Sequence, residues 1–518
     1  MRRSCLAAVP MLLWAGDALA GVTADQLWQA ARDFLAAEGI TVSATERREG
    51  GALVLTGGRV DLGDGLVLAL PDVTLADDGN GEVTVTLPER FPLVLTLPPE
   101  PGAPAEVTLD VAAAGLELRM RDLSADVLDF DLSADTLSAT LAPVPTTAAQ
   151  EARGEMTLAL ADLTLQHLHR VAEPEAMVDS RGGLGTLHAD LRVDLPSEGG
   201  RASLVLDLSD LQHEVTGQVP PGTAPVIERL DSQGDADLAG LMDLLDLGLG
   251  LEARLVHGPM AFAFDWPLEG TEGRIDMAIG VEGGTTALRL DRNGVLYDAE
   301  TGRADIRYKG DDPDIPLPEF EAAIGNYRLL ARLDFPGGDG GRSDGGDWAL
   351  IYRVAGVAFS PGLWSLADPD GIFPHDPMTL SLDLGGSYVL DPALLEPGWT
   401  PDPAAPPPLR ELTLVLNEVL MSGLGASTLG EGEFALDLSR MATVDDLPEG
   451  KGTLSFVTEG ANALIDRLSQ AGALTADEVQ AARLGLLFLG RLEGGADRLV
   501  TRLDLDGKSV TLNGQRIR

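Results

Sequence analysis

The 518-residue sequence contains one cysteine, three lysines and few aromatic residues. The cysteine, Cys5, precedes an apolar segment, whereas the acceptor cysteine of a lipoprotein would follow it. We expect this segment to be removed, which leaves a chain with neither a disulfide nor a thiolate nucleophile. A domain of this size can rely on its hydrophobic core instead.

Basic residues are also scarce, since 37 Lys and Arg face 82 Asp and Glu, for a formal net charge of −45. Binding to DNA or RNA requires clustered Lys and Arg, so nucleic acid is not an expected partner. The same charge opposes docking on anionic lipid surfaces. The hydrophobic fraction of 44% nevertheless exceeds that of disordered chains and indicates a folded protein.

Long apolar runs are absent as well. The longest Leu-rich stretch, Leu484 to Leu489, is far shorter than the ~18 residues that a membrane-spanning helix needs. Residues 1–20 are typical of a secretory signal, with Arg2 and Arg3 before an apolar core and the sequence Ala18-Leu19-Ala20 at its end. We predict export, cleavage after Ala20 and no transmembrane segment thereafter.

A short helix is predicted at the start of the exported chain. Thr23 and Gln26 have the spacing of a capping box, in which each side chain accepts a hydrogen bond from the backbone N–H of the other residue. Leu27, Ala31, Phe34 and Leu35 follow at helical spacing. Gly39 is a plausible end of this helix.

The period of the hydrophobic pattern then changes from 3.6 to 2. Leucines alternate with polar residues in many segments, as in Leu187 to Leu195 and Leu204 to Leu208. Gly, Asp and Asn turns separate these segments. Such alternation is typical of antiparallel strands with one buried and one solvated face. We therefore predict a mainly β fold of the α+β class, built from long curved antiparallel sheets or a sandwich.

Helical patterns recur at three later places. Asp237 to Leu247 is predicted to be helical, and so are residues 460–470, which end at Gly472. Thr475 and Glu478 form a second capping box, which begins the next helix. A closing β-hairpin over residues 503–512 completes a C-terminal section with a helical hairpin.

The composition suggests a division of the chain after the signal segment. Residues 21–390 form the strand-rich region, residues 391–410 are proline-rich and predicted to be a linker or an insertion, and residues 411–518 form the C-terminal α+β section. No fixed-period repeat is present that would indicate a solenoid or propeller.

The histidines provide one pattern that could begin a metal site. His167 and His169 project from the same face of a predicted strand, and Asp162 or His188 could complete the site if the strands pair suitably. Two ligands without a fixed third do not make a site, so a pair of surface histidines is the favoured interpretation. His213-Glu214 lacks the second histidine of a zincin motif, because position 217 is Gly.

Other chemical motifs fail on a required residue. Gly507-Lys508-Ser509 has Arg502 where a phosphate-binding loop needs Gly, and Ser427 has Leu429 where a nucleophile elbow needs Gly. The Gly/Asp-rich segment 337–342 begins like a calcium-binding β-roll repeat, but Arg342 replaces the ligand Asp and the repeat is single.

Acidic residues alone do not identify a site either. Asp311, Asp312 and Asp314 cluster without EF-hand spacing. No carboxylate pair for glycoside chemistry can be nominated among so many acidic residues. We therefore assign no catalytic, cofactor-binding or metal-binding residue and predict a protein that is not an enzyme.

The N-terminal segment 22–28 and the C-terminal signature resemble an uncharacterised alphaproteobacterial family, domain of unknown function 2125. The signature includes Gly460, Asn462, Gly472 and the segments 464–466, 503–507 and 513–515. The resemblance spans essentially the whole exported chain, and residues 401–408 would be an insertion. It implies a periplasmic location and brings no established activity.

Three hypotheses follow from the predicted Leu-faced sheets. The first is a non-enzymatic envelope protein that binds a lipid or another apolar ligand on a curved sheet, because few helices are available to cover the leucines. The second is a structural or interaction scaffold, with a closed β core and an acidic surface for envelope protein partners. The third, with least support, is a metal-dependent or glycan-active hydrolase.

Overall fold

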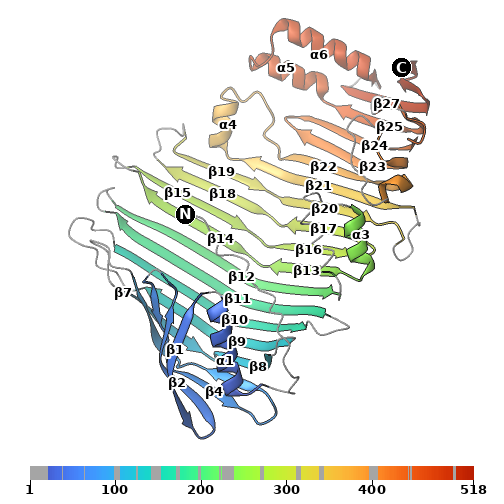
Figure 1. Ribbon diagram of the computed structural model, residues 1–518. Coiled ribbons are helices and arrows are strands. Elements are labelled where there is room, and N and C mark those ends of the chain that lie inside the picture. The colour runs from blue at the N-terminus through green and yellow to red at the C-terminus, as the bar shows by residue number, and fades with distance from the viewer. Residues whose placement is uncertain are drawn as a thin grey trace. The chain divides into compact units, whose positions relative to one another are not determined.

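The computed structural model describes residues 22–37, 39–63, 65–97, 106–123, 127–141, 153–170, 176–195, 200–220, 223, 238–268, 273–310, 317–337, 344–395, 406–441, 443, 446–493 and 497–518. The chain divides into two compact units, residues 1–221 with 269–272 (unit 1) and residues 222–268 with 273–518 (unit 2). Both consist mainly of antiparallel strands, which confirms the predicted fold class (Figure 1). The predicted signal segment, 1–20, lies outside the described residues.

Unit 1 contains one helix and twelve strands among its described residues. Their bounds are α1 (Ala24–Ala37), β1 (Thr41–Glu49), β2 (Ala52–Asp61), β3 (Val67–Ala69), β4 (Val73–Asp77), β5 (Val83–Thr86), β6 (Arg90–Thr96), β7 (Glu106–Ala114), β8 (Glu117–Leu123), β9 (Val127–Leu141), β10 (Arg153–Arg170), β11 (Ala176–Leu195) and β12 (Gly200–Val219). Two arms, β3–β6–β7 and β4–β5–β8, join β2 to β9, and β10, β11 and β12 follow in order.

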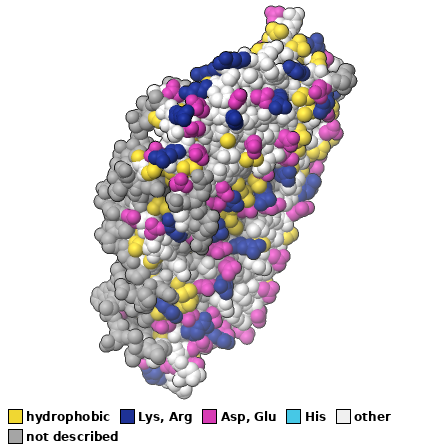
Figure 2. Space-filling model, turned by 90° about the vertical axis from the view of Figure 1, so that its right-hand side faces the viewer, with side chains coloured by type: hydrophobic (Ala, Val, Ile, Leu, Met, Phe, Trp, Pro, Cys, Tyr) yellow, Lys and Arg dark blue, Asp and Glu magenta, His cyan; other side chains and the backbone are white. Residues whose placement is uncertain are grey.

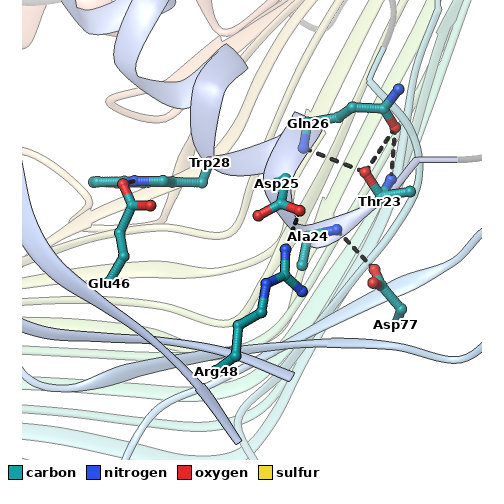
Figure 3. Close-up of polar contacts among 8 residues, drawn as sticks. All are labelled: Thr23, Ala24, Asp25, Gln26, Trp28, Glu46, Arg48 and Asp77. Carbon is teal, nitrogen blue, oxygen red and sulfur yellow. Dashed lines mark hydrogen bonds and ion pairs between the residues drawn. The ribbon is translucent and has the colours of Figure 1, made fainter. Parts of the chain in front are cut away.

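The contacts that hold α1 begin with the predicted capping box. The Thr23 N–H donates to Gln26 Oε1 (2.9 Å), and the Gln26 N–H donates to Thr23 Oγ1 (3.3 Å; Figure 3). Asp77 of β4 accepts from the Ala24 N–H at 2.7 Å, which satisfies another free donor of the first turn. The indole N–H of Trp28 donates to Glu46 of β1 at 2.7 Å.

Helix α1 covers one apolar face in unit 1. Leu27 and Trp28 pack with Leu53 and Leu55 of β2 and with Val83 of β5, and all five side chains are buried. Ala31 packs against the same cluster, as its position in the predicted helical face requires. The side chain of Phe34, another member of that face, lies outside the described part of the chain.

Strands β9 to β12 share a bend at which the hydrophobic alternation shifts by one residue. At the bend, two residues instead of one separate consecutive apolar positions in each strand. The pairing register places these two-residue segments in one row across the sheet. The pairs are Asp135-Thr136, Ala161-Asp162, Gly185-Thr186 and Ser209-Asp210. Asp162 and Asp210 have positive φ values of 54° and 52°, a conformation that Asp tolerates better than most residues. The extra residue keeps the later apolar side chains on the same face of the sheet and bends the strands at this row.

Unit 2 contains the remaining strands. Their bounds are β13 (Gly250–His257), β14 (Met260–Pro267), β15 (Arg274–Val281), β16 (Gly284–Asp291), β17 (Gly294–Thr301), β18 (Ala304–Gly310), β19 (Glu319–Ile324), β20 (Asn326–Asp334), β21 (Gly345–Phe359), β22 (Met378–Leu390), β23 (Leu409–Gly423), β24 (Ala426–Asp437), β25 (Glu449–Glu459), β26 (Arg491–Leu492), β27 (Arg498–Gly507), β28 (Ser509–Leu512) and β29 (Gln515–Arg516). Strands β13, β16, β17, β20 to β25 and β27 to β29 are hydrogen-bonded in that order.

A second row of bends crosses unit 2. Strands β13 and β14 lie in line, as do β15 with β16, β17 with β18, and β19 with β20 (Figure 1). Glycines mark the breaks, and hydrogen bonds continue across them, as from the Gly302 N–H to the Gly283 carbonyl at 2.9 Å. In β21 the break is at Gly356, whose φ of +69° favours glycine and whose Cα faces Gly325 at close range.

The helices of unit 2 are α3 (Leu238–Asp246), α4 (Pro361–Ala367), the 3₁₀ helix η2 (Pro392–Leu395), α5 (Ala461–Gln470) and α6 (Ala476–Leu489). Helices α3, α5 and α6 occur where the sequence predicts them. Thr475 and Glu478 form the predicted capping box of α6. Helix α4 is not predicted, although Ser360 before Pro361 is a typical start signal. Asp497 caps α5 by accepting from the Asn462 and Ala463 N–H groups (3.0 and 2.8 Å).

Several predicted loops lie partly outside the described residues. They include residues 396–405 of the predicted linker, residues 338–343 of the Gly/Asp-rich segment and the Asp311, Asp312 and Asp314 cluster. The predicted closing hairpin is present as β27 and β28. Asp506 pairs with Ser509, so the turn consists of Gly507 and Lys508, one residue beyond the turn at Asp506-Gly507 that the sequence predicts.

The bend in unit 1 can be tested at Asp210. Asp210→Gly should leave the free energy of unfolding nearly unchanged, whereas Asp210→Val should lower it by about 1–2 kcal/mol, since a β-branched residue disfavours positive φ. Urea unfolding measures both, and Gln212→Val, on the same polar face but in extended backbone, is the control. Equal stability of the two Asp210 variants would contradict the account.

Candidate ligand-binding face

One face of the unit 2 sheet is apolar over many strands. The pairing register places Leu251, Leu290, Val295, Leu333 and Trp348 in one continuous row from β13 to β21. Neighbouring rows repeat the pattern through β22 and β23. We call this surface the apolar face. It arises because alternate residues of a strand point to the same side and the register keeps the apolar positions opposite one another.

Many members of the apolar face are exposed to solvent. Those with at least 36% exposure are Leu251, Leu255, Tyr297, Leu333, Tyr352, Leu380 and Met421. They belong to β13, β17 and β20 to β23, which lie within seven neighbouring strands. The sequence is compatible with an open sheet face and with a closed sandwich. A closed sandwich would bury these side chains, so this part of unit 2 is an open sheet face.

The opposite face of the same strands is polar and held by cross-strand ion pairs. Arg328 of β20 pairs with Asp298 of β17 at 3.2 Å, and Arg353 of β21 lies 3.6 Å from Glu418 of β23. Asn417 donates to Asp383 at 2.8 Å beside them. Side chains of both charge signs intermingle over the surface in Figure 2. The charges of unit 2 that pair in this way are thus kept off the apolar face.

Helix α3 lies over one end of the apolar face (Figure 1). Residues of α3, of η2 and of the strands below line a pocket of about 370 Å³. The pocket is almost entirely apolar. It is lined by Met242, Leu333, Phe335, Pro336, Trp348, Tyr388, Leu390, Leu394, Leu409 and Leu412. Leu333, Trp348, Tyr388 and Leu412 also lie on the apolar face, so the pocket and the face are continuous.

The polar atoms at the pocket wall are few. The Tyr388 hydroxyl donates to the Asp334 carbonyl at 2.6 Å, and burial together with Asp334 raises the pKa of Tyr388 to about 12. The Trp348 indole N–H is buried and has no hydrogen-bond partner among the described residues. An apolar ligand would therefore meet a wall with neither a titrating group near neutral pH nor a charge.

The predicted histidine pair does not develop into a metal site. His167 faces Phe130 of β9, with ring centroids 5.3 Å apart, and burial followed by the nearby His169 lowers the pKa of His167. His188 is paired with Asp207 at 2.7 Å instead. Asp162 lies at the bend of β10. Within the described residues, no three His, Cys, Asp or Glu side chains converge as metal ligands would.

The structure contains a buried polar cluster that the sequence analysis does not predict. Asp368 accepts from the Ile372 and Phe373 N–H groups (2.8 Å each) and contacts His375 Nε2 at 3.1 Å, while the His375 ring stacks on Trp364. Burial opposes ionisation of Asp368, but these donors hold its pKa below the ordinary value of 3.8. Because two of the donors are backbone groups, the cluster fixes the loop that follows α4.

Scans of family models, curated proteins and solved structures found no protein that matches this chain. The resemblance to domain of unknown function 2125 therefore stays a prediction. None of the described helices has both the length and the apolar character required to cross a bilayer.

The attachment of α3 can be tested with two leucines. Leu245 is 1% exposed and Leu247, just beyond the helix, is 44% exposed. Leu245→Ala should lower the free energy of unfolding by about 2–5 kcal/mol, because it removes buried apolar contacts. Leu247→Ala should change it by less than about 0.5 kcal/mol. Thermal or urea unfolding measures both, and similar losses would contradict the placement of α3.

The Asp368 cluster predicts a pH dependence. A carboxyl group whose folded pKa is lowered stabilises the fold above its unfolded pKa, and this stabilisation is lost as pH falls through the folded pKa. Asp368→Asn should therefore be less stable than the wild type at neutral pH, and the difference should shrink toward about pH 2. Urea unfolding across this range measures it. A difference independent of pH would contradict the ionised Asp368.

Proposed function

We propose that this protein is a non-enzymatic component of the periplasmic cell envelope that binds a lipid or another elongated apolar molecule on the apolar face of unit 2. The observation that carries the proposal is the set of seven exposed large apolar side chains within seven neighbouring strands. Surfaces of this kind in soluble proteins mark binding sites for apolar partners. The predicted signal segment and the family resemblance support the location.

The dimensions of the face suit a long, narrow ligand. Adjacent strands are spaced by roughly 4.8 Å, so seven strands span roughly 30 Å, enough for an acyl chain laid across them. Each methylene group removed from water contributes about 0.8 kcal/mol to binding. The pocket beside α3 continues the face and could hold one end of such a chain.

Charge placement supports the same proposal. The cross-strand ion pairs of unit 2 use the opposite face, and a ligand on the apolar face need not displace them. A charged or strongly polar substrate would find no matching groups among Tyr297, Leu333, Tyr352, Leu380 and Met421.

The first test is to identify the small molecules that co-purify with the protein. The protein is purified gently from its native periplasm, and extracted small molecules are analysed by mass spectrometry. The proposal predicts a stoichiometric phospholipid or fatty acid. Protein free of any apolar ligand would contradict it and favour the scaffold hypothesis, in which envelope proteins are the partners.

Substitutions on the face locate the ligand. Tyr352→Asp combined with Leu380→Asp should lower the bound lipid by about tenfold or more, since burying two carboxylates against an acyl chain costs well above 1.4 kcal/mol. Circular dichroism should stay unchanged, because both side chains are already exposed. Leu429→Asp is the matched control, since Leu429 is 51% exposed but lies on the polar face of β24. Equal lipid loss in the control would contradict the assignment of the face.

A further inference from the structure

A second exposed apolar surface lies at the C-terminal end of unit 2, apart from the apolar face. Leu484, Leu487 and Phe488 share one side of α6 and are 70%, 62% and 62% exposed, and Leu489 and Leu492 follow with 50% and 55%. We call these five residues the α6 patch. Whereas α5 buries Ala461 and Ile465, α6 has no buried residue, so packing within the fold does not account for its leucines.

The surroundings of the α6 patch differ in charge from the rest of the chain. Residues 461–518 contain eight Lys and Arg and seven Asp and Glu, whereas residues 1–460 contain 29 and 75. The acidic character of the protein is thus absent around α6. Figure 1 shows α5 and α6 side by side at the C-terminal end of unit 2.

Hydrogen bonds bring the basic C-terminal strands to the end of α6. The Asn513 side chain donates to the Leu489 carbonyl at 2.9 Å, and Arg491 donates to the Asn513 carbonyl. Arg516 and Arg518 follow in the same terminal segment and are exposed. Arg483, one turn before Leu487 on α6, is instead paired with Asp466 of α5. Arg491, Arg516 and Arg518 therefore lie near an exposed apolar surface, and exposed apolar side chains next to cations can bind at a membrane interface.

The net charge of −45 does not prevent such binding. At physiological ionic strength the Debye length is about 8 Å, so charges on distant strands are screened from a surface that α6 touches. The balance of basic and acidic side chains near α6 therefore determines the electrostatic part of bilayer binding. Each Lys or Arg close to an anionic leaflet contributes about 1 kcal/mol to the binding free energy. The 14 residues of α6 are too few to cross a bilayer but can lie along its surface.

We propose that the α6 patch docks this protein on the surface of an anionic lipid bilayer. The inference rests on the proposed function, because a protein that carries lipid must reach a bilayer to load or release it. Leu487 and Phe488 enter the interface between headgroups and acyl chains, while Arg491, Arg516 and Arg518 face lipid phosphates.

Flotation with lipid vesicles tests the proposal on the full exported chain. Vesicles of phosphatidylglycerol with phosphatidylethanolamine should bind the wild type, and vesicles of phosphatidylcholine alone should bind it more weakly. Leu487→Glu combined with Phe488→Glu should reduce binding by about tenfold or more. Leu366→Glu is the control, since Leu366 is 50% exposed on α4, away from the α6 patch. Arg516→Gln with Arg518→Gln should weaken binding only to the anionic vesicles.

The outcomes separate this proposal from the ligand proposal. Wild type that keeps its co-purified lipid but does not bind vesicles would overturn the docking role and leave the apolar face intact. Equal vesicle binding by the Leu487 and Phe488 variant would also overturn it. If light scattering shows that the wild type is a dimer and the same variant a monomer, the α6 patch is a contact between two copies of the chain. That result would contradict docking on a bilayer.

Discussion

The structure depends on the need to cover the apolar side of a long antiparallel sheet. Alternation places every second residue on one side, so a strand with regular leucines creates an apolar face whether or not anything covers it. In unit 1, α1 covers part of this face through Leu27 and Trp28. In unit 2, α3 lies over one end, and Tyr352, Leu380 and Met421 stay exposed. The exposed part is the feature from which the proposed function follows.

The rows of bends keep each apolar side continuous while the sheet curves. A single extra residue would move all later leucines of one strand to the polar face. In β9 to β12 the neighbouring strands carry the extra residue in the same row, at Ala161-Asp162 and Ser209-Asp210 among others. In unit 2 the corresponding row uses glycines, including Gly283 and Gly356. Curvature and alternation are therefore adjusted together in both units.

Local signals in the sequence predicted much of the fold. The capping boxes at Thr23 and Thr475 are formed as their spacing requires, and Leu-faced strands occur where the period is two. The rows of bends were not predicted, because each depends on the register between strands far apart in sequence. The sequence predicts strands with an apolar face made of leucines. It does not predict that Tyr297 and Tyr352 are exposed members of that face. Their position depends on which strands the helices cover, and no local pattern encodes that.

The central claim is that the apolar face of unit 2 is occupied by lipid in the cell envelope. Its most direct test replaces Leu380 with a photoreactive amino acid, irradiates intact cells and weighs the adduct by mass spectrometry, with position 429 on the polar face as the reference. The account predicts a lipid adduct at position 380 and none at position 429. A cross-link from position 380 to another protein, with no lipid adduct, would contradict it.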